Sequence, residues 1–353
     1  MLHPVRPSCE GALSWAVELQ KDILEGLCDS SMSSTDVTIS WARSLRPDVA
    51  DWVERFVNLK HRTYKIINHM KVIAGLSASD KQTILTYFHE TLNFSTAFLD
   101  GANHPTIRQI NDFPASASVL GLLEAFYEKA LREISLPVDQ DGNYGSEFDR
   151  DDYVRIHGEA NFPRVCPLCD SPMKRAEVEH WLGKAKYPAL SCHPRNLIPS
   201  CHDCNALEKS TTPPLDINSA EPFTNWFHPY ERQAVGKVRI LVVASSARLE
   251  SIDTLDAVRA QNLDTLLGLS TLWSKECTPQ KQRFQRELRK RFRRQTLSMP
   301  ALQEEIQLLK EIASEEHKTV EPYALLQTAI LERVLAFQDE LSSWLDEVQA
   351  AIT

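Results

Sequence analysis

The chain has no long apolar segment and no internal repeat. Among its 353 residues no hydrophobic run approaches the ~18 residues that a membrane-spanning helix needs, and residues 1–7 lack the apolar core of a signal peptide. We therefore expect a cytoplasmic protein with no membrane partner. A composition of 42% hydrophobic and 25% charged residues is typical of a globular chain with two to three domains.

An excess of positive charge is also missing. The net charge of -9 argues against indiscriminate tight binding to a polyanion, so contact with nucleic acid would need a local basic surface or a partner that delivers the substrate. One basic cluster lies on a predicted helix around the apolar stripe Phe284, Leu288 and Phe292. It consists of Lys281, Arg283, Arg286, Arg289, Lys290, Arg291, Arg293 and Arg294.

This cluster has two interpretations. Runs of charge are usually solvated helix faces that pair with acidic neighbours. The alternative is contact with phosphates. For that contact the candidates are Arg286, Arg289, Lys290 and Arg293.

The eight cysteines do not suggest a disulfide framework. Four of them form two Cys-x-x-Cys pairs about thirty residues apart, which is the soft tetrahedral ligand set of a structural Zn²⁺ site. These are Cys166 with Cys169 and Cys201 with Cys204. The others are expected to be scattered thiols: Cys9, Cys28, Cys192 and Cys277.

Several polar residues between and after the two pairs have no use in a structural zinc site. They are Glu179, His180, Asn196, Asn205 and Lys209, which suit hard metals, proton transfer or phosphate. The alternative is a purely structural zinc ribbon whose loop carries incidental polar residues.

The order of these residues resembles the HNH endonucleases, which are ββα-metal nucleases. The matching pieces are Val178-Glu179-His180, Asn196-Leu197-Ile198-Pro199, and Cys201-His202-Asp203-Cys204-Asn205 with Lys209, within residues 165–230. The resemblance implies that His180 is the general base, that Glu179 and Asn205 hold a catalytic metal, and that Asn196 orients His180 and ties down its loop. Asn205 stands where the family often has His, and Glu179 where Asp is also common.

Elementary chemistry agrees with these roles. A neutral imidazole with a pKa of about 6.5 can accept a proton at physiological pH. One carboxylate and one amide oxygen suit Mg²⁺ or Mn²⁺, which take further oxygens from water and phosphate. Lys209, one helical turn after Asn205, is either a phosphate contact or a solvated lysine.

The flanks are predicted to be mainly α-helical, with the small ββα-metal module between two helical regions. We expect a helical domain at 1–137, an acidic linker at 138–152, the nuclease module at 153–235 and a helical domain at 236–353 that carries the basic helix. Apolar residues three and four apart predict helices over 12–27, 48–75, 119–134 and 323–352, and Val- and Ile-rich residues 237–244 predict a strand.

These observations lead to the expectation of a metal-dependent endonuclease that cleaves nucleic acid, DNA rather than RNA, under the control of a protein partner. Nucleases of this build resemble the HNH effectors of bacterial antiphage systems of the Septu and retron-linked kinds. Restriction-type and mobile-element nucleases present the same motif. The rival is a zinc-dependent binding or scaffold protein whose HNH motif no longer cuts.

Overall fold

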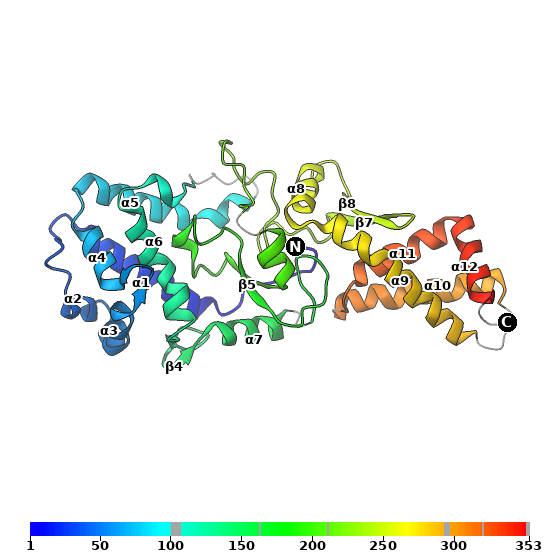
Figure 1. Cartoon of the computed structure of the whole chain (residues 1–353), viewed down its shortest axis with the longest axis horizontal. Coiled ribbons are helices and arrows are strands. Elements are labelled where there is room, and N and C mark those ends of the chain that lie inside the picture. The colour runs from blue at the N-terminus through cyan, green and yellow to red at the C-terminus, as the bar shows by residue number, and fades with distance from the viewer. Residues whose placement is uncertain (100–106, 162–163, 210–211, 293–296, 320, 351–353) are drawn as a thin grey trace.

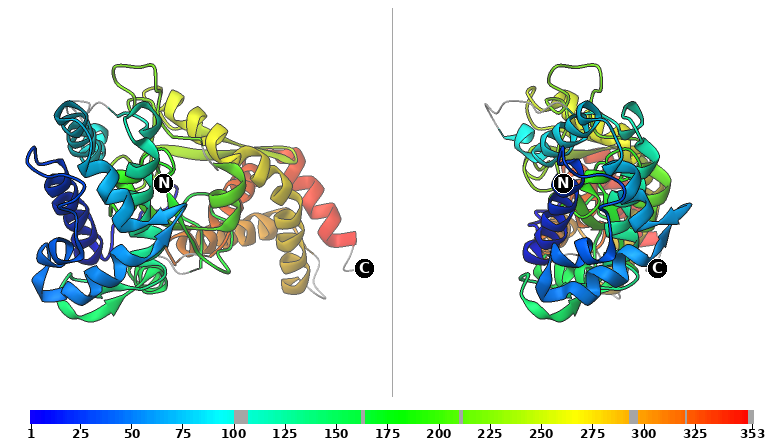
Figure 2. Two further views of the ribbon diagram at one scale, coloured as in Figure 1. Left: turned by 60° about the vertical axis from the view of Figure 1, so that its left-hand side comes forward. Right: turned by 90° about the vertical axis from the view of Figure 1, so that its left-hand side faces the viewer.

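The computed structural model describes residues 1–99, 107–161, 164–209, 212–292, 297–319 and 321–350. This part is mainly helical and contains small two-stranded antiparallel sheets. N-terminal helices form one end of the elongated molecule, C-terminal helices form the other, and the cysteine-rich region lies between them (Figure 1). Seen end-on, the N-terminal helices stand in front of that middle region (Figure 2). The expectation of a mainly α-helical chain is confirmed.

The N-terminal region packs amphipathic helices around one core. The apolar face predicted over 12–27 is confirmed in α1, where Ala12, Leu19 and Ile23 are fully buried. The helices are α1 (Glu10–Cys28), α2 (Ile39–Ser44), α3 (Ala50–Asn58), α4 (Ile66–Ala74), α5 (Ala78–Leu92) and α6 (Ser116–Ala125), which continues as the π-helical turn η4 (Phe126–Leu131). The short helices η1 (Pro47–Val49), η2 (Phe94–Phe98) and η3 (Ile110–Asp112) lie between them.

The single helix predicted over 48–75 is wrong. The chain forms α3 and α4 with a small hairpin between them, β1 (Lys60–His61) and β2 (Tyr64–Lys65), and Arg62 takes a left-handed φ of 54°. Phe56 and Ile66 are buried on either side, but Thr63 between them is exposed. The apolar period continues across the hairpin because both helices pack on the same core, and the polar residues 60–65 mark the break.

Residues 138–152, predicted to be an acidic linker, are instead ordered secondary structure. They span most of a hairpin, β3 (Leu136–Val138) and β4 (Tyr144–Phe148), and the start of α7 (Arg150–Ala160). The acidic side chains act as turn and cap residues. Asp139 Oδ1 accepts the backbone N–H groups of Asp141 and Asn143, both at 2.9 Å. Asp149 caps α7.

The middle region holds the antiparallel pair β5 (Glu177–His180) and β6 (Leu197–Ser200), with His180 opposite Leu197. A short helix, η5 (Pro188–Leu190), lies in the loop between them, and the π-helical segment η6 (Asp203–Glu208) follows β6. Val178 and Leu197 belong to the hydrophobic core of the N-terminal helices. The four cysteines of the two Cys-x-x-Cys pairs belong to the hydrophobic core of the C-terminal helices.

The C-terminal region begins with the hairpin of β7 (Val238–Val243), as predicted, and β8 (Ser246–Ser251). It continues with α8 (Ala257–Leu267), α9 (Leu269–Arg291), α10 (Met299–Thr319), α11 (Ala324–Ala336) and α12 (Gln338–Ala350). The single helix predicted over 323–352 is wrong, because Phe337 between α11 and α12 is extended and 50% exposed. Ile352, the last residue of that predicted helix face, lies outside the described residues. No helix in the described ranges has the length and apolar content needed to cross a bilayer.

Candidate metal centre and adjoining cleft

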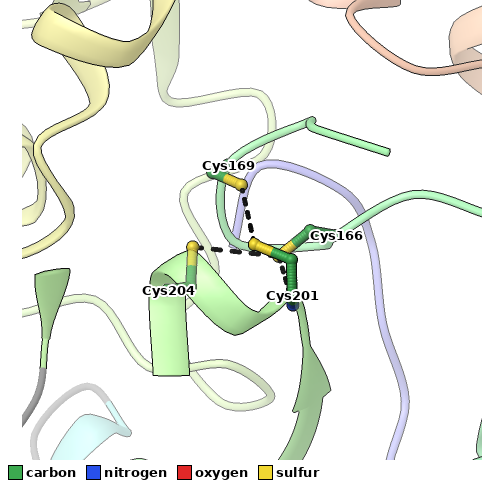
Figure 3. Close-up of side chains that lie close together, drawn as sticks. All are labelled: Cys166, Cys169, Cys201 and Cys204. Carbon is green, nitrogen blue, oxygen red and sulfur yellow. Dashed lines mark hydrogen bonds between the residues drawn. The ribbon is translucent and has the colours of Figure 1, made fainter. Parts of the chain in front are cut away.

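The first Cys-x-x-Cys pair lies in a tight turn. The backbone N–H of Cys166 donates to the carbonyl of Ser171 (2.9 Å), and that of Asp170 donates to the carbonyl of Cys166 (3.0 Å). Asp170 takes a left-handed φ of 67°, which a short polar side chain tolerates. The turn brings Cys166 and Cys169 to the same side, facing the second pair (Figure 3).

The second pair is positioned by the end of β6 and the start of η6. All four sulfurs lie within 4.8 Å of one another. Cys166 Sγ is 3.9 Å from Cys204 Sγ, and Cys169 Sγ is 3.6 Å from Cys201 Sγ. A tetrahedral Zn²⁺ with bonds of ~2.3 Å separates its sulfurs by about 3.8 Å. The predicted four-cysteine cluster is therefore confirmed as a site that could hold a structural metal such as zinc.

The electrostatics of the cluster also call for a cation. All four cysteines are buried. Hydrogen bonds from the other thiols lower the pKa of Cys201, whereas hydrogen bonds within the cluster raise the pKa of Cys169 and of Cys204. One thiolate is thus stabilised at the expense of its neighbours. A divalent cation at the centre would allow all four to ionise.

Distant segments meet around this cluster. Trp273 Nε1 on α9 donates to the carbonyl of Cys169 (3.0 Å). His3 Nε2 lies 2.8 Å from Asp170 Oδ1, and both side chains are fully buried. Asp170 also accepts the backbone N–H groups of Tyr323 and Leu325 at the start of α11. The candidate metal site is therefore a joint between the N-terminal segment and the C-terminal helices.

Strand β5 places His180 at the edge of a cleft. Its Nε2 lies 3.0 Å from the carbonyl oxygen of Ser191, and the Tyr127 ring meets the imidazole edge-to-face with centroids 4.5 Å apart. Burial lowers the pKa of His180 well below its usual range, and the positive charges of Lys184 and Lys209 add to this effect. The imidazole is neutral at pH 7. Because a carbonyl only accepts, Nε2 carries the proton and Nδ1 keeps the lone pair.

Glu179 and Lys209 form a buried ion pair. Lys209 Nζ lies 2.5 Å from Glu179 Oε1 and donates to the carbonyl of His180 (2.9 Å). Burial raises the pKa of the Glu179 carboxyl, and the Lys209 ammonium opposes that shift. Lys209 is only 1% exposed, which rules out a solvated lysine, whereas contact with a substrate phosphate stays a prediction.

Asn205 faces Glu177 instead of Glu179. Its Nδ2 donates to Glu177 Oε2 (2.6 Å), and His202 Nδ1 lies 2.9 Å from Glu177 Oε1. Although partial burial raises the pKa of Glu177, the bonds from Asn205 and His202 lower it overall. Sequence reasoning missed Glu177. The available signal was its spacing, since residues two apart on a strand share a face and Glu177 precedes Glu179 by two.

Asn196 fastens the loop between β5 and β6. Its Oδ1 accepts the backbone N–H of Leu182 (2.7 Å), and its Nδ2 donates to the carbonyls of Leu182 and Leu190, both at 3.0 Å. No hydrogen bond to His180 is among these contacts, so within the described residues Asn196 acts on His180 only through the loop.

The candidate site adjoins a cleft with a volume of about 650 Å³. Glu177, Glu179, His180 and Asn205 line it, together with basic side chains that sequence reasoning did not select: Arg132, Arg150, Arg175, Lys184 and Lys186. The N-terminal helices contribute Glu124, Tyr127 and Glu128 to the same lining. The N-terminal region therefore helps to build the candidate site.

The predicted basic helix is the second half of α9. Arg286 and Lys290 are exposed and form no ion pair with another described residue. Arg289 instead donates to the carbonyl of Glu347 on α12 (3.1 Å), and Arg291 pairs with Glu287 and Glu305. Arg293 and Arg294 lie outside the described residues. The cluster is thus partly a paired face and partly exposed positive charge.

Comparison with known proteins gives one distant relationship. No family model matches the chain, and no solved structure matches it. It is similar to protein ea31 of Escherichia phage lambda, with 34% identity over 108 residues, which cover 31% of this chain and 30% of that protein. The match thus spans less than a third of the relative's length. This match shows distant homology. The four-cysteine cluster that could bind zinc is a separate finding, from the structure.

Proposed function

We propose that this chain is a metal-dependent endonuclease that hydrolyses phosphodiester bonds of nucleic acid, DNA in preference to RNA. The observation that carries the proposal is the state of His180. It is a neutral imidazole whose Nε2 proton is held by the carbonyl of Ser191 at 3.0 Å, in a cleft that also holds two carboxylates and an amide. Such an imidazole can take a proton from water through Nδ1, a step that contributes roughly 10²–10⁴-fold to rate.

The side chains around His180 support a ββα-metal arrangement, in which β5, β6 and η6 are the three elements. Glu179 and Asn205 offer hard oxygen ligands, and Glu177 adds a second carboxylate at the same cleft. Mg²⁺ or Mn²⁺ held there would neutralise charge on the phosphate and the leaving oxygen. The donor set fits these ions because they need only one or two protein carboxylates. Lys209 provides the positive charge that Glu179 needs when no metal is bound.

Substrate phosphates would meet positive charge in two places. Arg175 is exposed at the cleft and forms no ion pair with another described residue. Arg286 and Lys290 on α9 are also exposed and form no ion pair with another described residue. Each phosphate contact that is lost should reduce the slope of log K against log salt concentration by about 0.9 for duplex DNA. We expect the Arg286→Ala/Lys290→Ala variant to bind DNA with a slope lower by up to twice that value, whereas Lys60→Ala/Lys65→Ala on the β1–β2 hairpin leaves it unchanged.

The test of activity is cleavage of plasmid DNA by the purified protein in Mg²⁺ and in Mn²⁺, with zinc retained. We expect the wild type to nick or linearise the plasmid and His180→Ala to lose at least a hundredfold in rate. His89→Ala is the matched control, because His89 is half exposed on α5 and far along the chain from the cleft. Activity that survives in His180→Ala would refute the proposal.

A second candidate function is binding without cleavage. The buried pair of Lys209 with Glu179 and the bond of Asn205 to Glu177 favour it, since both engage groups that a catalytic metal would need. A wild type that binds DNA in the salt titration and does not cleave, even with candidate partners added, would support this zinc-dependent binding protein.

A further inference from the structure

The hydrogen-bond partner of His180 is itself held by the N-terminal helices. Ser191 Oγ donates to the carbonyl of Leu123 on α6 (2.7 Å). Gln20 Nε2 on α1 donates to Ser191 Oγ (3.1 Å) and to the same carbonyl (3.3 Å). The main-chain oxygen of Ser191 accepts from His180 Nε2 (3.0 Å). Ser191 thus links α1 and α6, through its hydroxyl, to the imidazole, through its main-chain oxygen.

The Gln20 and Ser191 part of this network is fully buried, which makes its geometry restrictive. Gln20 and Ser191 are 0% exposed, and Gln20 Oε1 has no hydrogen-bond partner among the described residues. Because bulk solvent does not reach these side chains, a shift of Ser191 would leave buried donors unsatisfied. The Tyr127 ring in η4, directly after α6, also packs edge-to-face against the imidazole. Of these two restraints on His180, Tyr127 belongs to the N-terminal helices and Ser191 is held by them.

We propose that Gln20 is a positioning residue, through which the N-terminal helices set the tautomer and orientation of His180 by holding Ser191. The catalytic consequence of this inference rests on the proposed nuclease function, whereas the effect on the tautomer does not. A merely structural role for Gln20 predicts a loss of stability and nothing else.

The chain offers a matched control for that distinction. Gln327 on α11 is also a buried glutamine whose Nε2 donates two hydrogen bonds, to Gln280 Oε1 (3.1 Å) and to the carbonyl of Pro322 (3.2 Å). We therefore compare Gln20→Leu with Gln327→Leu. Ser191→Ala is the second variant, because it removes the hydroxyl contacts and keeps the carbonyl that faces His180.

The first readout is nitrogen NMR of protein with isotope-labelled histidine rings, with the His180 signals assigned through His180→Ala. We expect the wild type to show only the tautomer protonated at Nε2. Gln20→Leu and Ser191→Ala should show a mixture or broadened signals, and Gln327→Leu should match the wild type. The second readout is steady-state cleavage, in which we expect Gln20→Leu to lower kcat about tenfold or more with KM unchanged.

The inference is overturned if both Gln20→Leu and Ser191→Ala keep the wild-type His180 signals. It is also overturned if their kcat falls no further than that of Gln327→Leu. Should Gln20→Leu fail to fold, Ser191→Ala alone decides. If the wild type does not cleave, the nuclease proposal fails while the NMR comparison still tests the positioning role.

Discussion

Lys209 is the residue whose environment departs most from what its type suggests. A lysine at the end of a helical turn is ordinarily solvated, but here its ammonium is enclosed against Glu179 and the carbonyl of His180. It stabilises a carboxylate that burial disfavours. A buried pair of this kind contributes little net stability, yet losing one partner leaves an uncompensated charge.

We therefore expect Lys209→Met to lower the free energy of unfolding by about 3–5 kcal/mol at pH 7. The double variant Glu179→Gln/Lys209→Met should recover most of that loss, because it removes the stranded charge. Denaturant unfolding monitored by circular dichroism measures both. Equal stabilities of the single and the double variant would show that a stranded charge on Glu179 is not the cause of the loss.

The stability of the fold should depend on pH through His157 on α7. This residue is buried, Ser8 Oγ lies 3.0 Å from its Nδ1, and burial lowers its pKa from 6.5 to about 4. Between these values the unfolded chain binds a proton that the folded chain excludes, so stability falls as the pH decreases below 6.5. At 1.36 kcal/mol per pKa unit, we expect this residue to lower the free energy of unfolding by about 2 kcal/mol between pH 7 and pH 5.

The measurement is the free energy of unfolding at both pH values for the wild type and for His157→Gln. The variant lacks the titrating ring, so its loss on acidification should be smaller by about the same 2 kcal/mol. An identical pH dependence in the two proteins would contradict the assignment.

At the candidate site, the residues that could be predicted are those set by local spacing. The two Cys-x-x-Cys pairs predicted the four-cysteine cluster because that spacing is typical of tetrahedral thiolate sites. The burial of Lys209, the pairing of Asn205 with Glu177, and the wall supplied by Tyr127 depend on how separate segments pack. No local pattern encodes those contacts.

At the scale of elements, the hydrophobic period predicted which faces are buried and failed to predict where helices stop. The apolar period resumes after the hairpin that follows α3 and after Phe337 because the helices on both sides of each break pack on one core. Arg333 helps to turn the chain at Phe337: its guanidinium lies 4.4 Å from the ring centroid and pairs with Glu340 at 2.6 Å. The acidic segment was misread because Asp and Gly are common to linkers and to tight turns.

The close approach of this acidic hairpin to α1 gives a prediction at Gly11. A Cβ at that position would overlap the backbone of Asp141, although alanine normally favours a helix over glycine by about 1 kcal/mol. We expect Gly11→Ala to lower the free energy of unfolding by about 1–3 kcal/mol through overpacking. Gly183→Ala is the control, since nothing lies within 4 Å of its added carbon. A stabilised Gly11→Ala protein, measured by thermal unfolding, would show that the hairpin yields easily.

At the scale of the whole molecule, the four-cysteine cluster connects regions that are distant in sequence. We expect elemental analysis to find one zinc per chain. Chelation should lower Tm by more than an ordinary substitution does, because structural zinc sites contribute on the order of 10 kcal/mol in small domains. Cys166→Ser should lose the metal. Cys277→Ser, a buried cysteine outside the cluster, should retain it. Full zinc content in Cys166→Ser would remove the cluster as the binding site.

The contacts of Asp170 have a consequence for how the chain is made. The N–H of Leu2 donates to the carbonyl of Pro167, and the carbonyl of Asp170 receives the N–H of Tyr323. The joint at Asp170 therefore stays incomplete until residues near Tyr323 have been synthesised. Completion of the joint is a late, long-range step, and such steps fold slowly.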